Sequence, residues 1–222
     1  MGCLIVLEGL DGSGKGTQTD LLIETLRKSG RKVRKIDFPK YGSAGASLVE
    51  LYLNGGLGGS PFDTGAYAAS MFYAADRYVS FRQDWGKDYA DPDTVIVANR
   101  YTTANAYHQI SKLKKEEYDS FLAWLWDFEY TKLGLPEPDL VLLLDMPASL
   151  SAKMVEKRGE KKDIHELDTD YLSRCREAAL YVSRACGWTV IPCGNEASAE
   201  PYPRERILGE ITAAAERVLA GK

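Results

Sequence analysis

The residues best suited to phosphate chemistry lie in a short glycine-rich segment near the start of the sequence. Gly9, Gly14 and Lys15 have the Gly-x-x-x-x-Gly-Lys spacing of a P-loop. Such glycines let successive backbone N–H groups turn toward an anion, and the lysine adds a charge that reaches the outer phosphates of a nucleotide. The predicted ATP-binding residues are Gly9, Leu10, Asp11, Gly12, Ser13, Gly14, Lys15, Gly16, Thr17 and Gln18.

The segments on either side of this loop support the pattern, with one departure. Four apolar residues at 4–7 predict a buried strand, and apolar residues with helical spacing predict a helix over 17–28. Gly16 stands where a P-loop usually carries a hydroxyl, and Thr17 follows it. A chance glycine-rich turn is the alternative, and the order of strand, loop, lysine and helix argues against it.

The rest of the chain alternates short apolar runs with helical patterns. Strands are predicted at 4–7, 32–37, 94–98, 140–144 and 189–192, and helices at 17–28, 44–53, 64–82, 103–112, 116–133, 148–158, 169–185 and 204–219. Continuous apolar strands are typical of parallel sheets covered on both faces. The sequence therefore predicts one α/β domain over residues 1–222, a three-layer α/β/α P-loop fold with a five-stranded parallel sheet. Ligands are expected at the carboxyl ends of the strands.

Composition and charge narrow the kind of ligand. The 222 residues are 45% hydrophobic and 27% charged, and the net charge of −4 argues against a general nucleic-acid binder. No apolar run approaches the length of a membrane span, and the four cysteines lack Cys-x-x-Cys spacing. We therefore expect a cytoplasmic protein with a small-molecule partner and no nucleic-acid or membrane partner.

A second group of residues could hold an acceptor molecule. Tyr73 and Arg77 are four residues apart on a predicted helix, so a ring and a guanidinium share one face and could hold a flat base. The alternative is that the ring is a core residue and that an acid pairs with Arg77. Arg100 directly follows a predicted buried strand and suits bidentate phosphate binding. Its alternative is a surface ion pair.

These residues together resemble the thymidylate kinase family, enzymes that phosphorylate dTMP from ATP. The shared motifs are Glu8-Gly9-Leu10-Asp11 with Gly14-Lys15, Phe38-Pro39, Tyr73 with Arg77, and Arg100-Tyr101 with Asn105. The resemblance extends from about residue 4 to about residue 188. It implies transfer of the γ-phosphate of ATP to dTMP, with Mg²⁺ as cofactor and a homodimer formed through helices that flank the acceptor site.

The resemblance also implies roles for single residues. Tyr73 would stack on thymine, while Arg77 and Asn105 would contact the base. Arg100 would hold the acceptor phosphate, and Asp11 would lie near the acceptor sugar and the metal. The full set of predicted substrate-binding residues is Asp11, Phe38, Pro39, Lys40, Tyr41, Tyr73, Arg77, Arg100, Asn105, His108 and Gln109.

Two positions depart from the family pattern. Asn99 replaces the aspartate that usually precedes Arg-Tyr, so Thr17, Asp11 and Asp145 are the remaining candidate metal ligands. Tyr41 stands where some members carry a phosphate-binding arginine. We expect Lys40 or Tyr41 to take that role here.

A basic run between two predicted helices corresponds to the flexible lid of the family, at about 157–168. On composition alone a solvated loop is the simpler interpretation. Phosphoryl transfer, however, needs positive charge over the migrating group and exclusion of water. The candidate lid residues are Arg158, Lys161, Lys162 and Glu166, with Arg158 first among the cations. The predicted catalytic residues are then Lys15, Arg100, Arg158 and Asp11.

Two other functions remain open at this point. A deoxynucleoside kinase would need a base for the acceptor hydroxyl, and Asp37 at the end of the second strand could supply it. A nucleotide-binding regulator without turnover would account for Asn99 and the displaced hydroxyl. We expect His108 to be a helix contact and His165 a surface residue of the lid, rather than catalysts.

Overall fold

A five-stranded parallel sheet organises the chain. The computed structural model describes residues 1–158, 164–165, 168–195, 197 and 200–221. The strands are β1 (Cys3–Glu8), β2 (Lys32–Asp37), β3 (Thr94–Asn99), β4 (Leu140–Asp145) and β5 (Thr189–Pro192). Their order in the sheet is β2-β3-β1-β4-β5, and every pairing is parallel. All five predicted strands are confirmed, as is the predicted α/β class.

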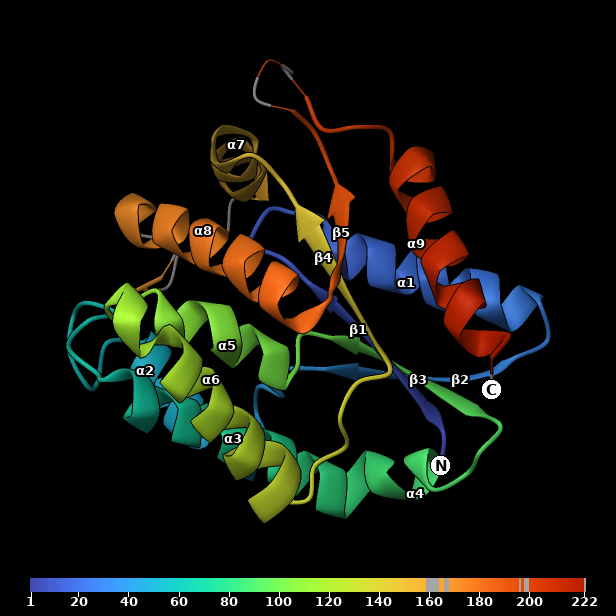
Figure 1. Cartoon of the computed structure of the whole chain (residues 1–222), viewed down its shortest axis with the longest axis horizontal. Coiled ribbons are helices and arrows are strands. Elements are labelled where there is room, and N and C mark those ends of the chain that lie inside the picture. Colours follow the sequence, from blue (N-terminus) through green and yellow to red (C-terminus); the bar gives the residue numbers. More distant parts are fainter. Residues whose placement is uncertain (159–163, 166–167, 196, 198–199, 222) are drawn as a thin grey trace.

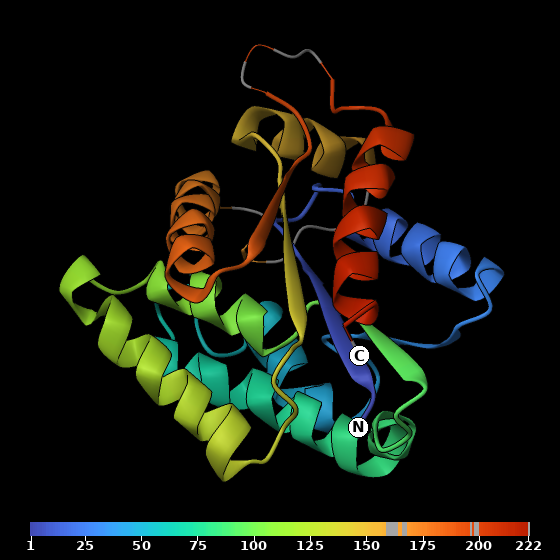
Figure 2. The same cartoon turned by 45° about the vertical axis from the view of Figure 1, so that its right-hand side comes forward.

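Helices cover both faces of this sheet (Figure 1). The α-helices are α1 (Lys15–Lys28), α2 (Ser47–Leu53), α3 (Ala66–Ser80), α4 (Gly86–Tyr89), α5 (Thr102–Ile110), α6 (Tyr118–Trp126), α7 (Ala148–Arg158), α8 (Thr169–Cys186) and α9 (Arg204–Leu219). Helices α1 and α9 lie on one face, and α3, α5, α6 and α8 lie on the other. The turned view of Figure 2 also shows α7 beyond the carboxyl ends of the strands.

The central strand β1 is buried on both sides, as its unbroken apolar sequence predicts. Ile5 and Leu7 pack in the cluster that holds Leu22 and Leu26 of α1. The alternate residues of β1 pack on the opposite face in a cluster that contains Trp85. Because successive strand side chains point to opposite faces, a strand with helices on both sides must be apolar at every position.

Two predicted helices are interrupted by π-helical turns. The turn η2 (Phe81–Trp85) follows α3, and the turn η4 (Asp127–Lys132) follows α6. Both segments were predicted as uninterrupted helices, over 64–82 and 116–133. A π-helical turn shifts the angular position of the residues after it, so a pattern with a period of 3.6 residues does not predict which way they face. In the described part of the chain, no helix is both long enough and apolar enough to cross a bilayer.

Candidate active site

The glycine-rich loop lies at the carboxyl end of β1 and leads into α1. Gly14 precedes the first helical residue with φ of 82°, a left-handed conformation that favours glycine. Gly12 is also left-handed, and a Cβ atom there would lie 2.4 Å from the backbone oxygen of Ser151 in α7. The Ser151 hydroxyl in turn donates a hydrogen bond to the backbone oxygen of Asp11. The loop is therefore packed directly against α7, the helix that leads into the predicted lid.

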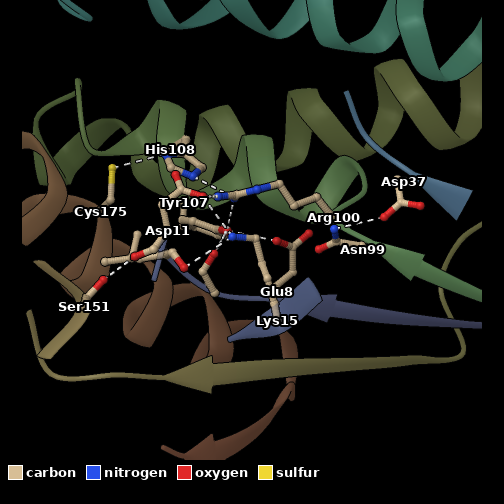
Figure 3. A network of polar contacts seen from close by, with 12 residues as sticks. Glu8, Asp11, Lys15, Asp37, Asn99, Arg100, Tyr107, His108, Ser151 and Cys175 are labelled. Atoms are coloured by element: carbon tan, nitrogen blue, oxygen red, sulfur yellow. Dashed lines mark hydrogen bonds and ion pairs between the residues drawn. The ribbon is translucent and has the colours of Figure 1, made fainter. Parts of the chain in front are cut away.

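One carboxylate joins the loop lysine to Arg100. Oδ1 of Asp11 accepts from Lys15 Nζ at 3.0 Å and from Arg100 Nη2 at 2.9 Å (Figure 3). Lys15 begins α1, and Arg100 follows β3 with φ of 65°. A positive φ at a non-glycine residue is held in place by its surroundings and is frequent at functional sites. The predicted catalytic residues Asp11, Lys15 and Arg100 are thus in contact.

A buried glutamate supports Arg100 from beneath. Glu8 ends β1 and is fully buried, and its carboxylate accepts from the Thr103 hydroxyl at 2.6 Å and the Tyr107 hydroxyl at 2.9 Å. It also accepts from the backbone N–H of Tyr101 at 3.0 Å. Arg100 Nη1 then donates to the Tyr107 oxygen at 2.8 Å. Glu8 therefore orients the start of α5 and, through Tyr107, the guanidinium.

Burial and neighbouring charge set the protonation of this cluster. Burial alone would raise the pKa of Asp11, but the charges of Lys15 and Arg100 hold that pKa well below its usual range. Burial, opposed by the charge of Arg100, raises the pKa of Glu8. Burial together with the charge of Arg100 lowers the pKa of Lys15, with Asp11 opposing this shift. Asp11 is therefore an anion at neutral pH, and it offsets part of the repulsion between the two cations.

A cavity of about 750 Å³ opens at this edge of the sheet. The loop residues Lys15, Gly16 and Thr17 line it together with Tyr73 from α3 and Arg100. The further lining residues that the sequence predicted are Asp11, Gly12, Gly14, Phe38, Pro39, Tyr41, Arg77, Asn105, His108 and Gln109. The predicted phosphate and acceptor groups therefore share one hollow.

Several predicted site residues do not line this cavity. Gly9, Leu10, Ser13 and Gln18 lie in the loop and first turn of α1 but outside the lining, and Lys40 and Asp145 are also absent from it. Lys40 Nζ pairs with Asp84 at 2.9 Å, and Asp145 receives two hydrogen bonds from Arg176 at 2.7 and 3.2 Å. The predicted lid residues Lys161, Lys162 and Glu166 and the side chain of Arg158 lie outside the described residues.

Arg77 both lines the cavity and pairs with an acid. Its Nε and Nη2 donate to the two carboxylate oxygens of Glu129 at 2.7 and 2.5 Å, and the exposed fractions of the two side chains are 2% and 0%. Glu129 is not among the predicted site residues, because the sequence predicts only a helix over 116–133 for its segment. Nothing in the local sequence marks it, since its partners come from two other helices, α3 and α5.

The two histidines lie together in the interior. The His108 and His165 rings stack with centroids 5.6 Å apart, and His165 Nε2 is 2.8 Å from the Tyr52 hydroxyl. The prediction that His165 is a surface residue is wrong, since the residue is only 5% exposed. Burial, with the charge of Lys112, lowers the pKa of His165 to about 3, and burial with the charge of Arg100 holds the pKa of His108 well below its usual value. Both rings are therefore neutral at physiological pH.

Asn99 uses its amide to hold the neighbouring strand. Its Nδ2 donates to Asp37 Oδ1 at 3.0 Å, across the paired ends of β3 and β2 (Figure 3). Asn99 lines the cavity, whereas Asp37 is exposed beside it. Where the resemblance implies a carboxylate, the structure thus has an amide that fixes the adjacent carboxylate of Asp37.

Comparison with known proteins agrees with this arrangement. The family model for thymidylate kinase matches residues 7–199. The chain belongs to the thymidylate kinase family. Thymidylate kinase from Mycobacterium tuberculosis is 31% identical over 194 residues, which cover 83% of this chain and 87% of that protein. Thymidylate kinase from Rhodopirellula baltica is 31% identical over 179 residues, covering 81% of this chain and 68% of that protein.

A solved structure supports the same fold. Thymidylate kinase from Candida albicans superposes with a TM-score of 0.70 at 19% identity, covering 97% of this chain and 92% of that chain. Family membership confirms the resemblance seen in the sequence, and the chain is an enzyme of this family, which phosphorylates dTMP with ATP. No finding favours the deoxynucleoside kinase or the inactive regulator.

Proposed function

We propose that ATP and dTMP meet phosphate to phosphate in the cavity, and that named residues of this chain carry the transfer to dTDP and ADP. The loop residues 9–18 would hold the phosphates of ATP, with Lys15 at the outer ones. Tyr73, Arg77 and Arg100 would hold dTMP. The observation that carries this proposal is the single cavity of about 750 Å³ lined by both groups.

Arg100 is well prepared to hold the acceptor phosphate. Nη1 donates to Tyr107 and to Nε2 of His108 at 3.0 Å, and one Nη2 hydrogen goes to Asp11. A guanidinium has five N–H donors, so Nε and one Nη2 hydrogen have no acceptor among the described residues. These two donors remain for phosphate oxygens, which guanidinium groups commonly bind in pairs.

The chemistry needs positioning and positive charge more than a base. An oxygen of the dTMP phosphate attacks the γ-phosphorus of ATP, and the bond to the β–γ bridging oxygen breaks to leave ADP. Because the attacking phosphate is already an anion at neutral pH, no side chain has to remove a proton. The neutral His108 fits this requirement, since it accepts a hydrogen bond from Arg100 and serves to orient it.

Two further groups are proposed to complete the site. Lys157 of α7 lines the same cavity as Lys15, and Arg158 follows it in the sequence toward the lid. Positive charge arriving from this side would stabilise the migrating phosphoryl group and help exclude water. Arg158 remains our first candidate for the catalytic cation of the lid.

The residues around the loop also suit Mg²⁺. Oδ2 of Asp11 accepts no hydrogen bond from any described residue, and Thr17 lines the same cavity. No cluster of three or more metal-binding side chains occurs in the described part of the chain. That is compatible with Mg²⁺, which keeps several waters and commonly takes one or two protein ligands besides phosphate oxygens. Mg²⁺ bound here would neutralise charge that develops on the phosphates. Asp145 is a weaker candidate metal ligand than Asp11, because Arg176 donates to both of its carboxylate oxygens.

We further propose a cytoplasmic homodimer. Tyr67, Met71 and Tyr78 share one face of α3 and are 47%, 50% and 39% exposed, and Leu48 and Leu51 of α2 are exposed as well. Contiguous exposed apolar side chains mark association surfaces. Sedimentation of the wild-type protein should give a dimer and that of Met71→Glu a monomer; a wild-type monomer would contradict the proposal.

The proposed cytoplasmic location is supported by the buried thiols of Cys175 and Cys193, which fit a reducing compartment.

A steady-state assay with Mg·ATP tests the proposed function. Phosphorylation of dTMP in preference to thymidine is expected. Phosphorylation of thymidine alone would favour the deoxynucleoside kinase, and nucleotide binding without turnover would favour the regulator.

A further inference from the structure

One buried carboxylate organises the wall of the cavity on the acceptor side. Glu129 lies in the π-helical turn η4 and is fully buried. Besides its two bonds from Arg77, it accepts from the Thr102 hydroxyl at 2.8 Å and from Asn105 Nδ2 at 3.2 Å. Side chains from α3 and α5 therefore converge on a residue that does not itself line the cavity.

Glu129 and the backbone oxygen of Ser70 together determine which way the Asn105 amide points. Nδ2 of Asn105 donates one hydrogen to Glu129 and the other to the backbone oxygen of Ser70, at 3.2 Å each. A carboxylate and a carbonyl oxygen can only accept, so the NH₂ group must face them. Asn105 lines the cavity, and its Oδ1 accepts no hydrogen bond from the described residues. Asn105 therefore offers the cavity an acceptor.

Glu129 also determines what Arg77 offers. Two of the three guanidinium nitrogens, Nε and Nη2, are directed at Glu129. The third nitrogen, Nη1, makes one long contact to the backbone oxygen of Tyr101 at 3.4 Å and carries a second hydrogen. Arg77 lines the cavity next to Asn105, so the wall presents a donor from Arg77 beside an acceptor from Asn105.

We infer that Glu129 is a specificity-determining positioning residue, which by orienting Arg77 and Asn105 selects a 4-keto pyrimidine over a 4-amino pyrimidine. Thymine and uracil present a carbonyl oxygen at C4 and an N–H at N3, which complement the donor and the acceptor. Cytosine presents an amino group and an unprotonated N3, which oppose both. This inference rests on dTMP as acceptor and adds the residue that sets the polarity of the pocket.

The preference for a 4-keto pyrimidine over a 4-amino pyrimidine is expected to be large. A site built to hydrogen-bond one pattern leaves its own buried polar groups unpaired when the wrong pattern binds, and such sites reject analogues by factors of roughly 10⁴. The carbon-5 methyl group is not read by these two side chains. The wall should therefore separate dTMP from dCMP strongly, while leaving the dTMP to dUMP ratio to other contacts.

Glu129→Gln tests the inference with little change of shape. The new side chain keeps one acceptor oxygen and sets an NH₂ group against a donor of Arg77, so the paired hydrogen bonds are broken and Arg77 and Asn105 are no longer held in one orientation. We expect the ratio of kcat/KM for dTMP to that for dCMP to fall by roughly 30-fold or more. The dTMP to dUMP ratio should stay within about threefold, because both bases present the same edge to this wall.

Asp127→Asn is the matched control. Asp127 lies in the same turn, is 53% exposed and pairs with Lys132 at 3.1 Å, away from Arg77 and Asn105. Asp127→Asn should leave the dTMP to dCMP ratio and the dTMP to dUMP ratio of kcat/KM unchanged. If Glu129→Gln lowers kcat/KM equally for dTMP, dUMP and dCMP, Glu129 only supports the structure and the inference is overturned.

A second variant covers the case in which Glu129→Gln does not fold. The double variant Arg77→Met with Glu129→Leu removes both buried charges, and apolar replacement of a buried ion pair is often tolerated. The preference for dTMP over dCMP should be lost. A preference within about threefold of the wild type in a folded variant, or a wild type with no preference, overturns the inference. A wild type that does not phosphorylate dTMP at all instead contradicts the proposed function.

Discussion

Asp11→Asn is the sharpest test of the charge arrangement at the active site. Oδ1 of Asp11 accepts one hydrogen bond from Lys15 and one from Arg100, and the carboxylate is 23% exposed. Hydrogen bonds to a charged group contribute roughly 1.5–3 kcal/mol each, against about 1 kcal/mol for neutral ones. Asparagine keeps the acceptor but loses the charge, and the two cations then repel each other without compensation. We expect the free energy of unfolding at pH 7, without nucleotides, to fall by about 2–4 kcal/mol.

The pH dependence of this loss gives a second, independent readout. The pKa of Asp11 is lowered in the folded state, so its contribution is fully present above the unfolded pKa of about 3.9 and is lost as pH falls through the folded pKa. The difference between wild type and Asp11→Asn should therefore be constant from pH 7 to about pH 5 and shrink below about pH 4. Urea unfolding at pH 7, 5 and 3.5 measures this difference.

Asp20→Asn provides the control for the same chemical change at a surface. Asp20 pairs with Lys35 at 2.8 Å but is 66% exposed, so its loss should change the free energy of unfolding by less than about 0.5 kcal/mol. The reasoning would be refuted if Asp11→Asn lowered the free energy of unfolding by less than about 1 kcal/mol, or if the difference in this free energy between variant and wild type did not change with pH.

Three further substitutions address activity and binding. Lys15→Ala should abolish transfer with the fold intact by circular dichroism, and normal turnover would refute the P-loop assignment. Arg158→Ala should lower kcat by roughly 10³-fold or more with little change in dTMP affinity, as expected for a group that acts mainly in the transition state; an unchanged kcat would move the role to Lys161 or Lys162. Gln109 is fully buried, lines the cavity and has no partner for either amide atom among the described residues. Gln109→Leu should therefore raise the free energy of unfolding by about 1 kcal/mol and raise KM for dTMP roughly tenfold. A lower free energy of unfolding together with a lower KM would contradict an amide that faces the ligand.

Local sequence was sufficient for the sheet and the phosphate loop. Strand β1 and the glycines before Lys15 are signals between near neighbours, because strand burial and loop conformation depend mainly on residue type and spacing. The carboxyl ends of parallel strands lie at one edge, so Arg100 after β3 could be placed near the loop before any contact was known. The contact of Arg100 with Asp11 agrees with that expectation.

The helical segments were less predictable at their ends. The two π-helical turns, η2 and η4, change the facing of residues that a regular helix would place elsewhere. His165 was expected at the surface because its neighbours are charged, yet Tyr52, 113 residues earlier in the chain, covers it. Charge in adjacent residues does not determine the burial of a side chain that packs on a distant helix.

The sequence by itself determined a P-loop enzyme with a parallel sheet and an arginine beside the phosphate loop, because those features are set by residues close together in the chain. Only the tertiary structure decided which way the side chains of Arg77 and Asn105 point. Arg77 and Glu129 are separated by 52 residues and Asn105 and Glu129 by 24, and their hydrogen bonds depend on how α3, α5 and the turn η4 pack together. The direction of an amide or a guanidinium is set by its partners, and these partners are brought together only by packing.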